Sequence, residues 1–452
     1  MNIIIAGDGE VGFNLAEALV NSNHNIFIID PHEELLKRIE SHADLMTIVG
    51  ESNSVSVLRK AHVDKADLVI SVLHEEPINV LTAILAKKLG AKKVIARVNT
   101  LNHVKDDIKK VYEELGIDIF ISPEDIAAKE IVSLIHQAQV IEKVDYHEGK
   151  LTVYSFKIEP EAPLIGKNLF QIAAEYPHLE FRVVSMRREG QRLVPSGETD
   201  FRPDDLVYII SKPKFFNELT LLTGKKKIEV NNIMMVGGGR VGRVAAMQLE
   251  HDYNVKVFEI NYNRCEELTE MFENALVIHG DARDIELLKE EDIQNADVFI
   301  AVTEDTETNI LTCLHARKFG VKKTFALVEN LNYIEIAQSV GIDTVLNKKL
   351  IASSYILQYA MGAQVKSLRR LGGIHAEMLE LIARPGSLVT KKPIQNIRFP
   401  EGTIIGGITR GEEDFIAVGD FQIKENDKVI VFSLPGNIAR LEKLFQKKST
   451  LL

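Results

Sequence analysis

Two clusters of glycine residues have the spacing of loops that hold phosphate groups. Each cluster reads G-x-G-x-x-G and lies between a short apolar segment and a segment with helical spacing. The glycines are Gly7, Gly9 and Gly12 in the first cluster, and Gly237, Gly239 and Gly242 in the second. Glycine permits the sharp turn and the close backbone approach that a pyrophosphate requires, and the following helix offers free N–H groups to the anion. A single G-x-G-x-x-G motif is weak support for a nucleotide-binding loop. Its repetition predicts two such loops.

An acidic residue ends the second predicted strand of each half. Asp30 follows the apolar segment 26–29, and Glu259 takes the equivalent place in the second half. In a Rossmann fold, a carboxylate at this distance from the glycine loop bonds the ribose hydroxyls of adenosine. Its charge would repel a 2′-phosphate, so the pattern predicts NAD rather than NADP. Asp30 could instead cap a helix that starts at Pro31, and the sequence leaves this alternative open.

These residues must be positioned by a parallel sheet. Between residues 1 and 138, short and almost uniformly apolar segments alternate with helical patterns, which is typical of a parallel sheet covered on both faces. The predicted strands are Ile3–Ala6, Ile26–Ile29, Leu45–Val49, Leu68–Val72 and Val94–Val98. The predicted fold class is therefore α/β, with a Rossmann-like domain in which the glycine loop follows the first strand.

After the first predicted domain the sequence pattern changes, and the second half of the chain then repeats the first. Residues 140–223 contain strand patterns and turn signals but no glycine loop, which fits a small α+β domain. The second half repeats the first at a constant offset, since Gly50, Asp67, Asn79 and Gly90 are matched by Gly280, Asp297, Asn309 and Gly320. We therefore predict a tandem duplication of two domain types. The predicted boundaries are 1–138 and 230–362 for the nucleotide-binding domains, and 140–223 and 365–448 for the α+β domains.

Composition and charge exclude several classes of protein. The chain of 452 residues carries a formal net charge of −11 at pH 7, which disfavours nucleic-acid binding. Its two cysteines, Cys265 and Cys313, suit a reducing cytoplasm and predict no disulfide framework. We expect no signal peptide, and no apolar run approaches the ~18–20 residues that span a bilayer. Any connection to a membrane is therefore expected to come through a partner.

The combined pattern resembles the RCK (KTN) regulators of potassium transport over essentially the whole chain. The resemblance rests on GDGEVG and GGGRVG, on Asp30 and Glu259, on GDA at Gly280–Ala282, on TEDTETN at Thr303–Asn309 and on PEGTIIGGITRG at Pro400–Gly411. It implies that RCK N-terminal domains, which bind NAD (NAD+ or NADH) or an adenine nucleotide such as ATP or ADP, alternate with RCK C-terminal domains. It also implies a cytoplasmic regulatory subunit that forms a dimer or a larger ring. Such a subunit is peripheral on the inner face of the cell membrane, bound to the membrane-embedded subunit of a Trk-type potassium uptake system.

The resemblance also points to two arginines that are placed differently in the two halves. Arg97 ends the fifth predicted strand, where an arginine of this family reaches a nucleotide phosphate and its planar guanidinium can bond two oxygens. A surface salt bridge is the alternative. The aligned residue in the second half is Leu327, whereas the second loop carries Arg240 where the first has Glu10. Asp8 adds a second carboxylate to the first loop, so that these acids either point to solvent or share a cation with the ligand.

The segments after the third and fourth strands are expected to contact the adenosine. In the family pattern G-D-A lies near the adenine and ribose, and the first half departs from it with G-E-S. After the fourth strand the family uses backbone and hydroxyl groups, so Leu73 offers its backbone only, and His74 is more simply an exposed loop residue. The predicted cofactor-binding residues are Gly7, Asp8, Gly9, Glu10, Val11, Gly12, Asp30, Glu51, Ser52, Leu73, His74, Arg97, Gly237, Gly238, Gly239, Arg240, Val241, Gly242, Glu259, Gly280, Asp281, Ala282, Thr303 and Glu304.

We expect a regulatory protein rather than an enzyme. A dehydrogenase needs a positioned acid or base and a substrate pocket besides its cofactor. The α+β domains offer only His147, His178 and His375, none in a recognisable catalytic pairing, and the usual metalloprotease, thiol-redox, serine-hydrolase and P-loop motifs are absent from the sequence. An NAD-dependent dehydrogenase is the less favoured alternative, and a regulator of another potassium channel or antiporter is a second one.

The last helix of each nucleotide-binding domain has a broad apolar surface. The apolar residues are Ile126, Ile131, Leu134 and Ile135 in the first helix, and Ile351, Tyr355, Ile356, Tyr359 and Met361 in the second. Such a surface implies burial against another domain or chain, or packing on the parent sheet. Together with the resemblance, it slightly favours a homo-oligomer.

Overall fold

The computed structural model describes residues 1–7, 10–20, 24–40, 45–99, 106–360, 365–371, 376–434 and 436–446. The chain divides into two compact units that are each built from separate stretches. The first comprises Met1–Ile126, Lys348–Arg370 and Pro435–Gln446, and the second comprises Ala127–Asn347, Leu371–Leu434 and Lys447–Leu452. The two halves of the duplicated sequence are therefore interleaved.

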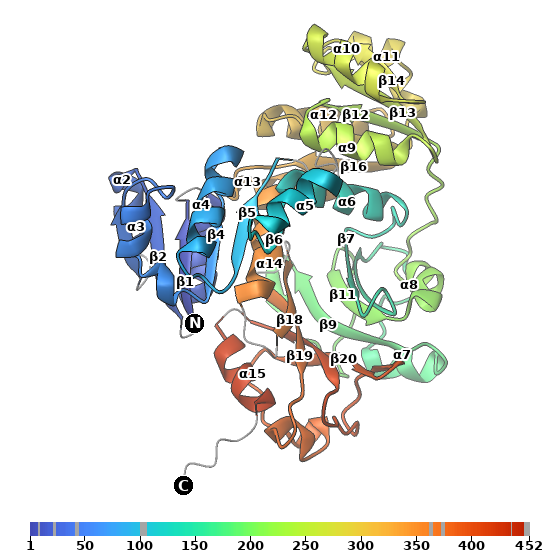
Figure 1. The fold of residues 1–452 in the computed structure, drawn as a ribbon. Helices are drawn as coiled ribbons and strands as arrows, with labels where there is room; N and C mark the ends of the chain where they lie inside the picture. Colours follow the sequence, from blue (N-terminus) through green and yellow to red (C-terminus); the bar gives the residue numbers. More distant parts are fainter. Residues whose placement is uncertain are drawn as a thin grey trace. The chain divides into compact units, whose positions relative to one another are not determined.

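The first unit contains a six-stranded sheet in the order β3-β2-β1-β4-β5-β6 (Figure 1). Its strands are β1 (Asn2–Ala6), β2 (Asn25–Asp30), β3 (Met46–Val49), β4 (Leu68–Ser71), β5 (Val94–Arg97) and β6 (Ile119–Ile121). All neighbouring strands are parallel, as their nearly uniform apolar composition predicts. The strand β6 was not predicted, because three residues are too few to show a periodic pattern.

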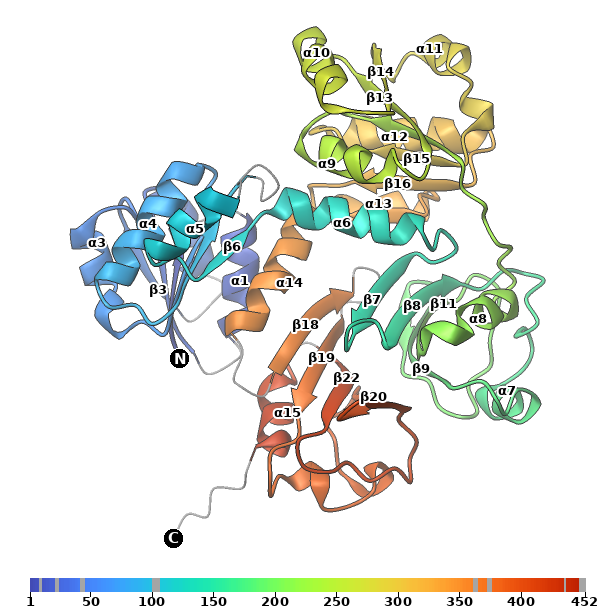
Figure 2. The same ribbon diagram turned by 45° about the vertical axis from the view of Figure 1, so that its right-hand side comes forward.

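Helices cover both faces of this sheet, and one helix that packs on them comes from the second half of the sequence. The helices are α1 (Glu10–Val20), α2 (Glu33–Glu40), α3 (Val55–Lys60), α4 (Glu76–Lys88), α5 (Asp106–Glu114) and α14 (Lys348–Ala360). The first unit also contains α15 (Ile438–Phe445) and all but the last residue of strand β18 (Val365–Leu371). Figure 2 shows α14 beside α1, against which it packs. Helix α6 (Pro123–Ile135) begins in the first unit and ends in the second.

The second unit contains a second sheet of the same topology, ordered β14-β13-β12-β15-β16-β17. Its strands are β12 (Asn232–Val236), β13 (Asn254–Glu259), β14 (Leu276–His279), β15 (Val298–Ala301), β16 (Lys323–Leu327) and β17 (Thr344–Leu346), and its helices are α9 (Arg240–Leu249), α10 (Tyr262–Met271), α11 (Ile285–Glu290), α12 (Thr306–Lys318) and α13 (Asn332–Ser339). All its neighbouring strands are parallel. The predicted duplication of a Rossmann-like domain is confirmed.

The same unit holds two small antiparallel sheets. The first module has the order β10-β9-β11-β8-β7 and comprises β7 (Glu142–Tyr146), β8 (Leu151–Lys157), α7 (Leu169–Glu175), β9 (Phe181–Arg188), β10 (Gln191–Leu193), β11 (Leu206–Ser211) and α8 (Phe216–Leu222). In the second, β19 (Ala376–Ile382), β22 (Lys428–Ser433), β20 (Ile404–Arg410) and β21 (Glu413–Ile416) follow one another across the sheet. Short 3-10 helices span Val63–Lys65, Pro213–Phe215, Ile293–Asn295, Leu388–Thr390 and Ile394–Asn396. Residues from both modules, including Tyr208 and Phe432, form one buried apolar cluster.

The apolar surface of α14 is partly buried within the chain itself. Ile356 is fully buried in the unit where α14 packs against α1, whereas Tyr355 stays 38% exposed. Met361 lies outside the described residues. Burial within the chain thus accounts for Ile356 and leaves Tyr355 exposed. In the described part of the chain, no helix combines the length and apolarity needed to cross a membrane.

Candidate functional site

Two positions of the second glycine loop require glycine, one because of its backbone conformation and the other because a side chain would clash. Gly237 has a φ of +100°, in the left-handed region. A Cβ atom on Gly242 would lie 1.9 Å from the carbonyl oxygen of Gly237, so the first turn of α9 packs directly on the end of β12. The first loop repeats this contact, because a Cβ on Gly12 would lie 2.0 Å from the carbonyl oxygen of Gly7. The spacing of the motif therefore fixes the approach of helix to strand.

The middle glycine of the second loop faces open space. Gly239 is the N-cap residue of α9, and a Cβ atom built on it would meet no atom of the described residues within 4 Å, apart from its own chain neighbours. No side chain caps this helix terminus in the described structure. Free N–H groups at a helix N-terminus attract anions. The space in front of Gly239 therefore fits a phosphate group, and a side chain there would fill it.

The carboxylate of Glu259 lies against this loop. Glu259 ends β13 and is 4% exposed. Its Oε2 accepts a hydrogen bond from the N–H of Gly238 at 2.9 Å, and its Oε1 accepts one from the N–H of Asn261 at 2.8 Å. Arg264 Nη1 lies 3.4 Å from Oε2. Glu259 thus holds the loop, and since each carboxylate oxygen accepts more than one hydrogen bond, it retains capacity for a ribose hydroxyl.

Asp30 occupies the equivalent place in the first half. It is 1% exposed, and its Oδ1 accepts a hydrogen bond from the N–H of His32 at 2.9 Å and lies 2.8 Å from Nδ1 of the same residue. Helix α2 begins at Glu33, so Pro31 is not its first residue. Asp30 accordingly bonds the segment before the helix at the carboxyl end of β2.

Two buried asparagines position the segments after the fourth strands. Oδ1 of Asn309 accepts from the N–H and the hydroxyl of Thr303, at 3.0 and 2.7 Å, and its Nδ2 donates to the Thr303 carbonyl. Asn79 bonds the backbone N–H and carbonyl of Leu73 in the same way, at 2.8 and 2.9 Å. The predicted site omitted both asparagines, although their recurrence in the two halves was a signal for them. Because the hydroxyl of Thr303 is held by Asn309, its position is fixed without a ligand.

The residues after the third strands differ between the halves. Asp281 forms an ion pair with Arg283 at 2.6 Å, and this pairing lowers the pKa of the Asp281 carboxyl. Ala282 is buried. The hydroxyl of Ser52 is also buried and lies 2.9 Å from that of Thr82 on α4, so it is engaged inside the domain rather than at the sheet edge.

Arg97 forms a buried ion pair rather than the surface salt bridge considered as its alternative. Its Nη2 lies 3.2 Å from Oε1 of Glu124, and the two side chains are 13% and 5% exposed. Arg97 Nε and Glu124 Oε2 are buried without a hydrogen-bond partner among the described residues. The corresponding positions of the second half hold Leu327, at the end of β16, and Lys349, the second residue of α14. Both members of the pair are therefore specific to the first half.

The remaining predicted residues fall into four groups. Asp8 and Gly9 lie outside the described residues, as does the side chain of Glu10. Val11 and Val241 are buried and anchor their helices. Residues at the exposed rim are Glu51, His74, Arg240 and Glu304, while Leu73 and Gly280 are half-buried. The second half thus brings together a complete loop, Glu259, Asp281 and Thr303 at the carboxyl ends of neighbouring parallel strands.

Neither cysteine provides a reactive thiol near these sites. Cys265 donates from Sγ to the carbonyl oxygen of Glu259, and Cys313 to that of Phe325. Burial raises the pKa of both thiols above the usual range. A thiol with a raised pKa is a poor nucleophile. The arrangement can bind a phosphate and a ribose, and these thiols add no covalent chemistry to it.

Comparison with known proteins gives consistent matches along the chain. The TrkA-N domain model matches residues 3–123 and 233–348, and the TrkA-C domain model matches residues 153–223 and 378–446. The chain is 31% identical to the Trk system potassium uptake protein TrkA homolog 1 of Methanosarcina mazei, over 99% of this chain and 100% of that protein. It is 32% identical to the Trk system potassium uptake protein TrkA of Vibrio alginolyticus, over 99% of both chains.

Solved structures share the fold at low sequence identity. The GsuK channel bound to NAD superposes with a TM-score of 0.60 and 16% identity, covering 98% of this chain and 78% of that one. The GsuK RCK domain gives the same TM-score and identity, covering 98% and 94%. The order of domains therefore matches RCK architecture from end to end.

Proposed function

The chain belongs to the TrkA family, and from this membership we propose that it is the nucleotide-sensing regulatory subunit of a Trk-type potassium uptake system. Nucleotide binding is supported by the open space at Gly239, which lies in front of the uncapped helix α9 and beside the buried carboxylate of Glu259. NAD+ or NADH, or an adenine nucleotide such as ATP or ADP, has the phosphate and ribose groups that these features suit. The solved relative bound to NAD supports this choice of ligand class.

We expect NADH to bind at least about tenfold more tightly than NADPH, because Asp30 and Glu259 would face the extra phosphate and juxtaposed like charges cost several kcal/mol. Calorimetric titration of the full chain with each nucleotide measures the difference. Glu259→Gln keeps an oxygen that can accept the hydrogen bond from the loop. It should reduce the difference in affinity between NADH and NADPH at the second site. Equal affinities of the wild-type chain for the two nucleotides would contradict the assignment of these carboxylates.

The proposed mechanism is a change in the orientation of the nucleotide-binding domains that gates the membrane subunit. A ligand shifts such an equilibrium only through different affinities for the two states. The buried Arg97–Glu124 pair offers such a difference, because Arg97 Nε, which has no hydrogen-bond partner among the described residues, can bond a phosphate in one arrangement and lose it in another. A coupling of about 1–3 kcal/mol, roughly 5–150-fold, is ordinary for allostery.

Potassium flux in vesicles that carry a Trk-type membrane subunit tests this function. Flux should depend on this chain and should change as NADH, NAD+, ATP and ADP are varied. Arg97→Ala should weaken the response while the second loop still binds nucleotide. Flux that ignores every nucleotide, with binding verified in the same preparation, would refute gating. If the response appears only with a different potassium channel or antiporter, that protein is the partner in place of the Trk-type subunit.

The same preparation separates the regulatory function from catalysis. A regulator should leave NADH unconsumed in the presence of candidate oxidants, whereas sustained turnover would support a dehydrogenase.

We also propose that the chain forms a homodimer or larger ring at the inner face of the cell membrane, held there by its partner. Light scattering that shows a monomer at micromolar concentration would count against this assembly.

A further inference from the structure

A cavity of about 590 Å³ lies within the second unit, where α7 and β9 of the first small module meet β21 of the second and the loop that follows it. Its volume is in the range that encloses a small organic ligand. The lining is mostly apolar and includes five aromatic side chains, those of Phe170, Tyr176, Phe181, Phe415 and Phe421. Phe170 and the lining residue Val418 are 65% and 50% exposed, so a ligand in the cavity would remove apolar surface of both modules from water.

One aromatic wall of the cavity is held in place by its neighbours. The rings of Phe415 and Phe421 contact each other, with their centroids 5.3 Å apart. The guanidinium carbon of Arg410 lies 5.7 and 5.2 Å from these centroids, and the same side chain forms an ion pair with Asp427 at 2.8 Å. This wall is therefore preorganised, which lowers the entropic cost of binding a ligand.

The cavity also contains a cation that meets no carboxylate in the described part of the chain. Arg182 lies on β9 and is half-buried, and its Nη1 donates to the carbonyl oxygen of Ala417 at 2.7 Å. Burial lowers the pKa of Arg182, and no charge of the described residues opposes this effect. A guanidinium has five N–H donors, so most of those of Arg182 remain available to a ligand.

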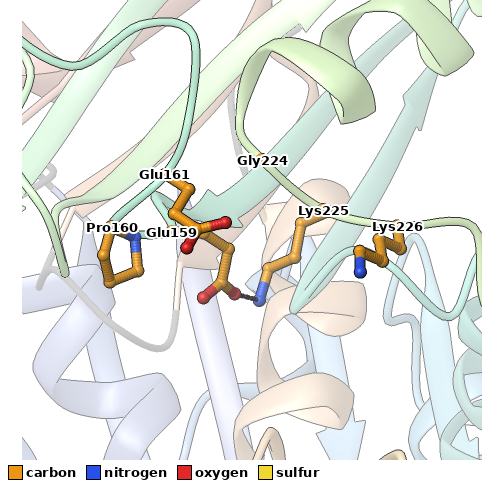
Figure 3. Close-up of a pocket in the computed structure, with 6 residues that line it drawn as sticks. All are labelled: Glu159, Pro160, Glu161, Gly224, Lys225 and Lys226. Atoms are coloured by element: carbon orange, nitrogen blue, oxygen red, sulfur yellow. Dashed lines mark hydrogen bonds and ion pairs between the residues drawn. The ribbon is translucent and has the colours of Figure 1, made fainter.

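Other charged groups at the cavities of this unit already have partners. Glu180 is the other charged residue among the described residues that line the same cavity as Arg182, and its carboxylate pairs with Lys212 at 2.6 Å. Figure 3 shows a smaller cavity at the connector between domains, where Lys225 pairs with Glu159. The cation of that cavity is neutralised by its own lining, which is not the case for Arg182.

The second small module shows that the fold does not require an arginine at this strand position. Arg182 and Ile404 have the same register in the two antiparallel sheets. Arg188 and Arg410 also occupy equivalent positions, and each of them forms an ion pair with a buried aspartate. The duplication has thus kept one arginine as a structural ion pair, whereas Arg182 is specific to the module whose helix and strand line the cavity.

We propose that this cavity binds a small molecule with an aromatic body and a single carboxylate, and that Arg182 bonds the carboxylate. A planar guanidinium matches the two oxygens of a carboxylate. One cation balances one negative charge, and the nearby carboxylate of Glu180 disfavours a more highly charged ligand such as a nucleotide. The site is separate from the glycine loops, which follow β1 and β12.

Naphthylacetate is the probe for this site, and naphthylethanol is its neutral analogue. Each is titrated calorimetrically into the full chain with NADH present. The wild-type chain should bind the acid at least about tenfold more tightly than the alcohol, since hydrogen bonds with a charged group contribute that much. Arg182→Ile introduces the residue type of the second module and should remove this preference. Arg192→Ile, on the neighbouring strand β10 and outside the lining, should retain it.

Thermal midpoints close to that of the wild type establish that both variants are folded. The proposal is overturned if millimolar naphthylacetate does not bind, if the wild-type chain binds acid and alcohol equally, or if the preference for the acid persists in Arg182→Ile.

A second variant keeps the arginine and changes the charge beside it. Val418→Asp adds a carboxylate to the lining at an exposed position, so it should weaken binding of the acid more than binding of the alcohol. Equal weakening of both compounds would contradict an ionic contact between the ligand and the cavity.

Discussion

Replacing Gly239 with valine is expected to remove nucleotide binding at the second loop without disturbing the fold. Among the described residues, no atom other than those of the chain neighbours lies within 4 Å of the position that the new Cβ would take, so the side chain has room. It would occupy the space in front of α9 and deny a phosphate two or more N–H donors. The loss should amount to about 100-fold or more in affinity, or ~3 kcal/mol.

Calorimetry with NADH tests this expectation, since the stoichiometry should fall by one site per chain while the thermal midpoint stays close to that of the wild type. Gly242→Val is the matched control, because its Cβ would lie 1.9 Å from the carbonyl oxygen of Gly237. This variant should lose more than about 4 kcal/mol of stability as well as the site. Unchanged binding by a folded Gly239→Val chain would place the phosphate elsewhere.

The second large effect is expected at the buried pair of Arg97 and Glu124. Glu124→Ala removes the carboxylate that neutralises Arg97, whose side chain is only 13% exposed. An uncompensated buried charge costs about 3–5 kcal/mol. Chemical denaturation should show this loss in the first unit, in which both residues lie.

The double variant Arg97→Leu with Glu124→Leu distinguishes the interaction within the pair from the cost of leaving one charge buried alone. It should recover most of the stability, because apolar replacement of both members of a buried pair is often neutral or stabilising. Leucine already stands at the equivalent of Arg97 in the second half, at Leu327. If Glu124→Ala is as stable as the wild type, the pair does not neutralise a buried charge. A double variant that is less stable than the single one would assign the pair a net favourable interaction.

The fold could be predicted in most of its elements, because short apolar strands between amphipathic helices admit few arrangements. The glycines, Asp30 and Glu259 recur at fixed places in both halves, and this recurrence predicts a nucleotide-binding edge on each sheet. By contrast, β6 has only three residues and gives no periodic signal. The packing of α14 against α1 joins segments from the two halves of the chain, which local patterns do not encode.

The sequence by itself determined the duplicated architecture and the chemistry available at the loops, since glycine spacing and strand-end carboxylates are local constraints on the backbone. Only the tertiary structure decided how these groups are used. It placed the carboxylate of Glu259 on the N–H of Gly238, and it buried Arg97 against Glu124. It also buried Lys323 at the start of β16, whereas Lys93, which has the same place before β5, is exposed. Partner choice and burial depend on contacts between distant segments, and the same residue type can therefore take different roles in the two halves.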